Sequence, residues 1–168
     1  GWVLLTTGSG TLAGTRVQGI TFFNDFYFTN GVNVIQKMDS GAQTFDDAGN
    51  APALKYITGF FNRIVGINRV TPGEDPTVVQ WSADGIGDEW DPGIDQSAGF
   101  APLIDSPSDR SDFGTGIFAF DNIIVILRER SIWLGNKQPI AALPFNFYTQ
   151  VPGQGCDAPY STQVFRSS

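Results

Sequence analysis

The sequence predicts an all-β, β-propeller-like fold of about three four-stranded blades. Residues 116–135 contain runs of Ile, Val and Phe separated by short polar turns, as expected for antiparallel strands. The order aromatic residue, two turn residues, large apolar residue occurs three times, at residues 23–26, 61–64 and 120–123. The 20 Gly and 10 Pro are spread along the chain, and no segment has an apolar stripe at helical spacing.

The first repeat is expected at residues 17–46. Its predicted strands are residues 17–23, 26–29, 32–38 and 42–45. An Asn24-Asp25 turn joins the first two, because Asn and Asp tolerate the positive φ of a tight hairpin. Asn30-Gly31 predicts a second two-residue hairpin, which leads into the third strand.

The second repeat is expected at residues 53–104, with its first turn at Asn62-Arg63. Its predicted strands are residues 53–61, 64–70, 77–82 and 99–104. The acidic segment 83–97 interrupts it, and Trp90 in that segment needs apolar cover. Residues 82–90 also resemble the Asp-box hairpin of sialidase-like propellers, which is a structural turn.

The third repeat is expected at residues 115–151. Its first hairpin turns at Asp121-Asn122, a connection follows at residues 136–144, and a fourth strand is predicted at residues 146–151. Residues 128–130 are interpreted as a solvated or intersubunit corner. Further strands are expected near the two ends of the chain, at residues 2–7 and 161–166.

Three blades do not close a ring, since propellers contain about four to eight. Residues 1–168 are therefore expected to form one propeller-like region that belongs to a larger propeller or assembles with other copies. A β-sandwich with similar hairpins is the alternative fold.

The charge and cysteine content limit the possible partners. Net charge is −7, and without a basic cluster the chain lacks the electrostatic footprint of tight phosphate-backbone binding. A single cysteine, Cys156, excludes an internal disulfide and fits a reducing compartment. No run reaches the roughly 18 apolar residues of a membrane helix, so no membrane segment is expected.

Histidine is absent, which removes the commonest general base and metal ligand. Triads that contain His, His-based zinc sites and Cys-His pairs are therefore excluded. Cys156 lies among turn formers without a basic neighbour that would lower its pKa, so it is interpreted as a structural residue.

Carboxylates are the remaining route to chemistry. The candidate cation ligands are Asp84, Asp88 and Asp91, because Ca²⁺ binds carboxylate and carbonyl oxygens. Their spacing does not match an EF-hand loop, and a catalytic pair would need carboxylates from different blades. A solvated loop is the favoured interpretation, and the sequence predicts no catalytic residue, no cofactor and no enzyme activity.

Several short motifs in residues 55–164 carry a family resemblance. They are QWS at residues 80–82, DEWDP at 88–92, GI at 116–117, VILRERSIW at 125–133, and the GC and APYS segments within 155–161. This pattern resembles β-propeller virion proteins of tailed bacteriophages, such as tail hub, nozzle or head-tail connector-associated proteins.

The resemblance implies a non-enzymatic structural component of a virion, assembled in the host cytoplasm and in contact with other virion proteins and copies of itself. The acidic net charge adds the hypothesis that DNA passes through without specific binding. The competing interpretation is an extracellular carbohydrate-binding or glycoside-hydrolase-like propeller, with carboxylates and exposed Trp side chains at one channel mouth. A β-sandwich binding domain is a third possibility.

Overall fold

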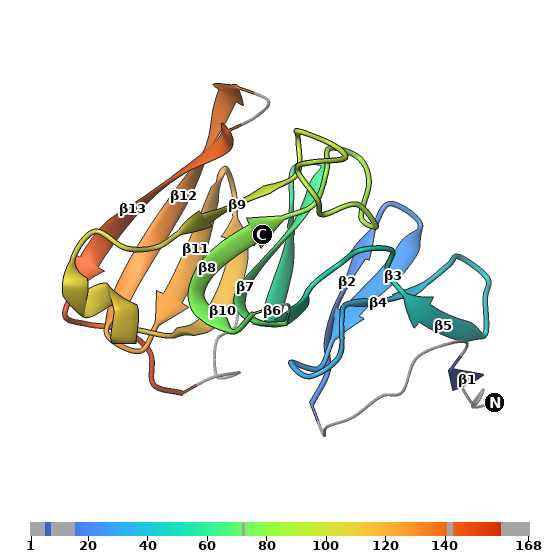
Figure 1. Cartoon of the computed structure of the whole chain (residues 1–168), viewed down its shortest axis with the longest axis horizontal. Coiled ribbons are helices and arrows are strands. Elements are labelled where there is room, and N and C mark those ends of the chain that lie inside the picture. Colours follow the sequence, from blue (N-terminus) through green and yellow to red (C-terminus); the bar gives the residue numbers. More distant parts are fainter. Residues whose placement is uncertain (1–5, 8–15, 72, 141–142, 159–168) are drawn as a thin grey trace, which may run out of the picture.

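The structure, a computed structural model, describes residues 6–7, 16–71, 73–140 and 143–158. Its strands form three sheets that lie side by side, with sheet 2 between sheets 1 and 3 (Figure 1). One short 3-10 helix, η1 (Pro107–Ser111), precedes sheet 3. The predicted all-β class with three four-stranded antiparallel units is confirmed, and one further short strand adds to sheet 1 in parallel. None of the described helices is long and apolar enough to cross a membrane.

Sheet 1 corresponds to the first predicted repeat. Its strands are β1 (Thr6–Thr7), β2 (Gln18–Phe22), β3 (Asp25–Thr29), β4 (Gln36–Met38) and β5 (Thr44–Asp47). The order is β1-β5-β4-β3-β2, and β1 pairs parallel to β5 while the others are antiparallel. The rest of the strand predicted at residues 2–7, and the whole of the strand predicted at residues 161–166, lie outside the described residues.

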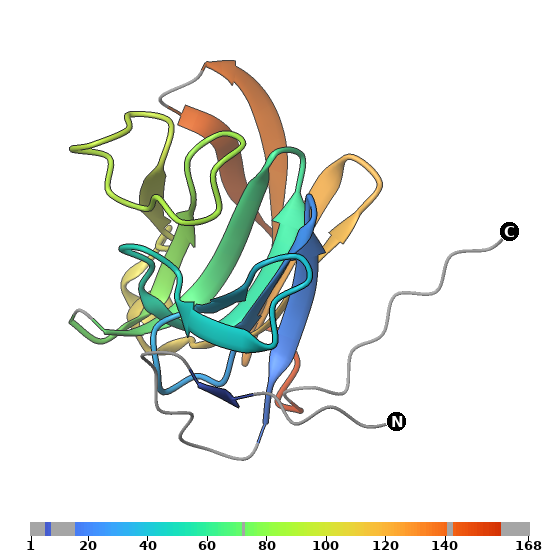
Figure 2. The ribbon, with the colours of Figure 1, turned by 90° about the vertical axis from the view of Figure 1, so that its right-hand side faces the viewer.

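Sheets 2 and 3 are antiparallel meanders in chain order. Sheet 2 contains β6 (Ala53–Phe60), β7 (Arg63–Thr71), β8 (Asp75–Trp81) and β9 (Gly99–Pro102). Sheet 3 contains β10 (Gly114–Phe120), β11 (Ile123–Arg128), β12 (Ser131–Ile140) and β13 (Leu143–Pro152). The first strands of the three sheets lie next to one another, with β6 between β2 and β10 (Figure 2).

The first turns of sheets 1 and 2 lie one residue earlier than predicted. Phe22 pairs with Asp25 and Phe60 with Arg63, so the turn residues are Phe23-Asn24 and Phe61-Asn62. Positive φ falls on Phe23 (52°) and Phe61 (51°), so the expectation that Asn or Asp adopts it is wrong for these two turns.

Burial explains the shift. Phe22 and Phe60 are 7% and 3% exposed in the cores between sheets, and a one-residue slip would turn every side chain of the strand to the opposite face. In sheet 3 the turn is Asp121-Asn122, as predicted, with φ of 53° at Asp121.

The Asn30-Gly31 hairpin is not formed. The Asn30 side-chain oxygen accepts the N–H groups of Val32 (3.0 Å) and Asn33 (2.9 Å), which makes a wider loop, and the next strand begins only at Gln36. Within that loop Ile35 is fully buried in the core between sheets 1 and 2. Burial of this side chain accompanies the late start of β4.

The connection predicted at residues 136–144 is also wrong, because β12 and β13 continue into it as one long hairpin. Asn136 pairs with Asn146, Lys137 with Phe145, and Ile140 with Leu143. Pro139 fits there because the register shifts between Lys137 and Ile140, and proline is tolerated at such an irregularity.

Two hydrophobic cores hold the sheets together. The core between sheets 1 and 2 contains Phe22, Tyr27, Ile57, Ile64 and the loop residue Trp90. The core between sheets 2 and 3 is centred on Tyr56, Phe60, Val65, Trp81, Ile124, Ile126, Trp133 and Phe145. Sheet 2 is therefore covered on both faces, which accounts for the burial of every residue of β7 from Arg63 to Asn68.

Candidate functional site

The candidate cation ligands all lie in the loop between β8 and β9, but each has a different partner. Asp84 pairs with Arg63 (3.4 Å), Asp88 accepts the Tyr27 hydroxyl (2.9 Å), and Asp91 accepts the N–H of Gly93 (2.7 Å). Among the described residues, no group of three or more His, Cys, Asp and Glu side chains could hold a metal ion. The geometry gives the cation hypothesis no support.

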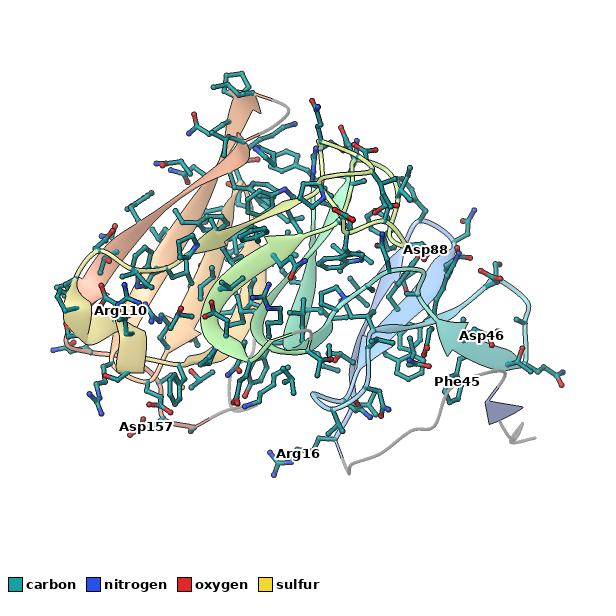
Figure 3. All side chains as sticks on the ribbon, in the orientation of Figure 1. Arg16, Phe45, Asp46, Asp88, Arg110 and Asp157 are labelled. Atoms are coloured by element: carbon teal, nitrogen blue, oxygen red, sulfur yellow. The ribbon has the colours of Figure 1, made fainter. Side chains whose placement is uncertain are left out.

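Lys37 is the centre of the ionic cluster that contains Asp88. Its Nζ lies 3.2 Å from Asp25, 2.9 Å from Asp39 and 3.0 Å from Asp88. Figure 3 labels Asp88 at the boundary between the loop and sheet 1. The cluster therefore joins a loop of sheet 2 to β3, β4 and the turn after β4.

The electrostatics of this cluster favour a fixed charge state at neutral pH. Burial would lower the pKa of the Lys37 ammonium, but its hydrogen bonds to Asp39, Asp88 and Asp25 raise it above the ordinary value. Burial, and then the hydrogen bond to Asp88, raise the pKa of the Tyr27 hydroxyl. Lys37 stays protonated and Tyr27 stays neutral, so neither group exchanges a proton near neutral pH.

Backbone contacts next to the cluster fix the loop further. Asn50 donates its N–H to the Asp88 carbonyl (3.2 Å), and its side-chain oxygen accepts the N–H of Trp90 (2.6 Å). Gly49 has a φ of 53°, and a Cβ there would collide with the Asp88 carbonyl, so glycine is required for this approach. Trp90 finds the apolar cover that the sequence demanded, with 1% of its surface exposed.

A second ionic cluster centres on Arg128 and corrects an expectation from the sequence. Arg128 is not a solvated corner: its side chain is fully buried. It donates to the carbonyl oxygens of Leu103 (2.7 Å) and Asp112 (2.7 Å from Nε), and to that of Asp109 (2.5 Å). Of the predicted corner, only Arg130 is exposed.

The alternation of side chains along β11 predicts which face of sheet 3 carries Arg128. Ile124, Ile126 and Arg128 share one parity on β11, and the two isoleucines face the core between sheets 2 and 3. Period 2 therefore puts the guanidinium on the covered face. No comparable pattern in the sequence predicts which carbonyl groups accept hydrogen bonds from the guanidinium.

Asp112 completes this cluster from the segment before β10. Its carboxylate lies 3.6 Å from Arg128 Nε and accepts the N–H of Arg130 (2.7 Å) and the hydroxyl of Ser131 (2.5 Å). Burial lowers the pKa of Arg128, and the charge of Asp112 opposes that effect. Because a guanidinium stays protonated in proteins, the pair is a permanent ionic link between segment 103–113 and sheet 3.

A pocket of about 440 Å³ lies beside η1 and the ends of β12 and β13. The carboxyl groups that line it are Asp105, Asp109 and Asp112. Asp105 accepts the Thr149 hydroxyl (2.7 Å), while Asp109 accepts the N–H groups of Asp105 (2.8 Å) and Ser106 (2.6 Å). Partial burial would raise the pKa of Asp109, but these N–H groups hold it below its ordinary value. The lining groups serve the local fold.

The described tryptophans also serve the fold. The three described tryptophans, Trp81, Trp90 and Trp133, are 1%, 1% and 2% exposed. A glycan-binding surface needs exposed aromatic faces, and these indoles do not provide one. Cys156 is half-buried, and its thiol donates to the Ala158 carbonyl (3.5 Å).

The two clusters thus differ in position but have the same architectural effect, which is to join segments far apart in the sequence. Comparison of the sequence with protein-family models and with curated proteins gives no match.

Proposed function

We propose that this chain is a non-enzymatic structural component of a tailed-phage virion, in the tail, nozzle or head-tail region. The observation that carries the proposal is that the ionic clusters around Lys37 and Arg128 join loops to sheets. Their charged groups are committed to permanent links, as a rigid building block requires. The motif resemblance at residues 80–92 and 125–133 supplies the virion context.

The carbohydrate-active alternative has less support. It requires carboxylates that converge from different blades and aromatic side chains that are open to a sugar ring. Asp84, Asp88 and Asp91 instead lie in one loop with separate partners, and the described tryptophans are buried. No specific contact favours hydrolysis.

DNA passage is not part of this proposal. The hypothesis required acidic loops near the axis around which the sheets are arranged. The acidic segment 83–97 lies between β8 and β9, whereas β6 is the strand of sheet 2 that lies next to β2 and β10. Net charge alone then remains as its support.

The proposal is tested by mass spectrometry of tailed-phage particles. The particles are purified by density gradient from a lysate whose phage genome encodes this sequence. We expect peptides of this chain at a copy number that is fixed relative to the major tail protein. Immunogold labelling with an antibody against the purified chain should then mark the tail or the neck.

The matched control is the lysate fraction that contains no particles. Peptides confined to that fraction would contradict a virion role. Release of reducing sugars by the purified chain from bacterial polysaccharides, abolished by Asp84→Asn or Asp88→Asn, would overturn the non-enzymatic assignment.

A further inference from the structure

Sheet 3 has an apolar face on the side away from sheet 2, called here the outer face of sheet 3. Cross-strand register places two rows of side chains on it, side by side over all four strands. The rows are Phe118, Val125, Leu134 and Tyr148, and Phe120, Ile123, Asn136 and Asn146. The apolar members are half-buried, except Phe120, which is 47% exposed. The face carries no charged side chain in these rows.

Positions counted from the first hairpin of each sheet show what this face corresponds to. The last residue before the turn is Phe22, Phe60 or Phe120, and the third residue after the turn is Tyr27, Val65 or Val125. In sheets 1 and 2 these positions are buried against the next sheet, with exposures of 7% and 3% before the turn and 2% and 0% after it.

The outer face of sheet 3 therefore continues a series of two established interfaces. The sequence of β11, IIVILR, agrees with that position. A sheet with one face in water alternates apolar and polar residues, whereas a strand covered on both faces is apolar throughout. β11 has the composition of a strand that is covered on both sides, yet on its outer side only Leu127 is buried, while Ile123 and Val125 are half-buried.

Sheet 1 offers the complementary surface on its face away from sheet 2, called here the head face. Phe26 stacks on Phe28 at 5.8 Å between ring centroids, and Phe28 meets Phe45 edge to face at 5.1 Å. Phe26 and Phe28 are the second and fourth residues after the turn, the positions that Ile124 and Ile126 occupy in the sheet 2–sheet 3 core. Phe28 and Phe45 are each 6% exposed, whereas Phe26 is 37% exposed and is therefore the open part of this face.

We propose that the outer face of sheet 3 docks on the head face of a second copy of this chain. Each copy contributes both halves of the contact, so a two-fold axis relates two identical head-to-tail contacts and closes the dimer. The dimer is a ring of six sheets, within the range of about four to eight blades in propellers. Within the proposed function, the partner is thus a second copy of the chain. The evidence for this dimer is the position of the sheets and the burial of their faces.

Analytical ultracentrifugation of the full chain at micromolar concentration tests this assembly. We expect a species of twice the 18.2 kDa chain mass. Phe120→Glu and Phe26→Lys place a charge on opposite halves of the contact, and each alone should weaken dimerisation about 100-fold, because an unpaired charge would be buried at both contacts. Leu134→Glu is a second variant of the same face, and circular dichroism verifies that each variant is folded.

An equimolar mixture of Phe120→Glu and Phe26→Lys supplies the decisive result. Their heterodimer contains one unchanged contact and one that pairs opposite charges, so mixing should restore the dimer. Ile94→Glu, at a 71% exposed apolar position in the β8–β9 loop, is the matched control and should dimerise like the unmodified chain.

Three outcomes would overturn the inference. They are a folded monomer of the unmodified chain at every concentration, a Phe26→Lys variant that still dimerises, and a mixture that stays monomeric. The second outcome would indicate pairing of two sheet 3 faces. The result is separate from the virion proposal, because a chain found in particles can be monomeric in solution and a dimer can be absent from particles.

Discussion

Lys37 of β4 and Asp88 of the β8–β9 loop form an ion pair of 3.0 Å between Nζ and Oδ2, which links a loop of sheet 2 to sheet 1. Asp88 also accepts the Tyr27 hydroxyl, from a residue 61 positions away in the sequence. This contact closes the gap between two sheets at the edge of their shared core, so its removal should loosen the loop before it unfolds the sheets.

Lys37→Met should lower the free energy of unfolding by about 1–2 kcal/mol, because three carboxylates lose their shared cation while partial exposure limits the loss. A double-mutant cycle with Asp88→Asn should give a coupling of about 0.5–1 kcal/mol, which decreases in high salt. Urea unfolding at two salt concentrations measures both. Strict additivity of the two substitutions would show that this ion pair contributes nothing.

Arg128→Met should destabilise the protein by about 3–5 kcal/mol, since it leaves Asp112 buried without its cation and removes a hydrogen-bond donor from three carbonyl groups. Arg110→Met changes an exposed arginine of η1 and should cost less than about 0.5 kcal/mol. Thermal unfolding of both variants makes the comparison. Equal effects would mean that the buried guanidinium is not the anchor of segment 103–113.

Asp109→Asn tests the acid dependence of η1. The folded-state pKa of Asp109 is lowered, so its carboxylate contributes stability above the unfolded pKa of about 3.9, and this contribution is lost as the pH falls through the folded pKa. The variant should be less stable by about 1 kcal/mol at pH 7 and nearly equal to the unmodified protein at pH 2–3.

Urea unfolding as a function of pH measures this difference. Asp157→Asn removes an exposed carboxyl outside η1 and is the control for the substitution itself, which should cost less than about 0.5 kcal/mol at pH 7. If the stability difference for Asp109→Asn stayed the same at low pH, the loss of the negative charge would not be its cause.

Asp121→Val should cost about 1–2 kcal/mol, because a β-branched residue is forced to keep a φ of 53° at the turn between β10 and β11. Asn122→Val, at the neighbouring turn position without positive φ, should cost less than about 0.5 kcal/mol. Thermal unfolding measures both. If the order were reversed, the turn would have a different conformation in solution.

The sequence by itself determined the strand content, the grouping of strands into three sheets and the need to bury Trp90. These features depend on local information, namely apolar runs, period-2 alternation and turn residues between them. The absence of His likewise removed whole classes of chemistry without reference to the fold. The alternation of side chains along β11 was also sufficient to predict that Arg128 is buried, although the sequence analysis interpreted it as part of a solvated corner.

Only the tertiary structure decided the register of the turns and the partners of the charged groups. Phe23 and Phe61 adopt positive φ because their neighbours Phe22 and Phe60 must face an adjacent sheet, and local propensity does not contain that requirement. Asp88 meets Lys37 only when sheets 1 and 2 are stacked. Contacts between residues so far apart in the sequence form only when the sheets pack face to face, and the sequence of a single strand does not contain that information.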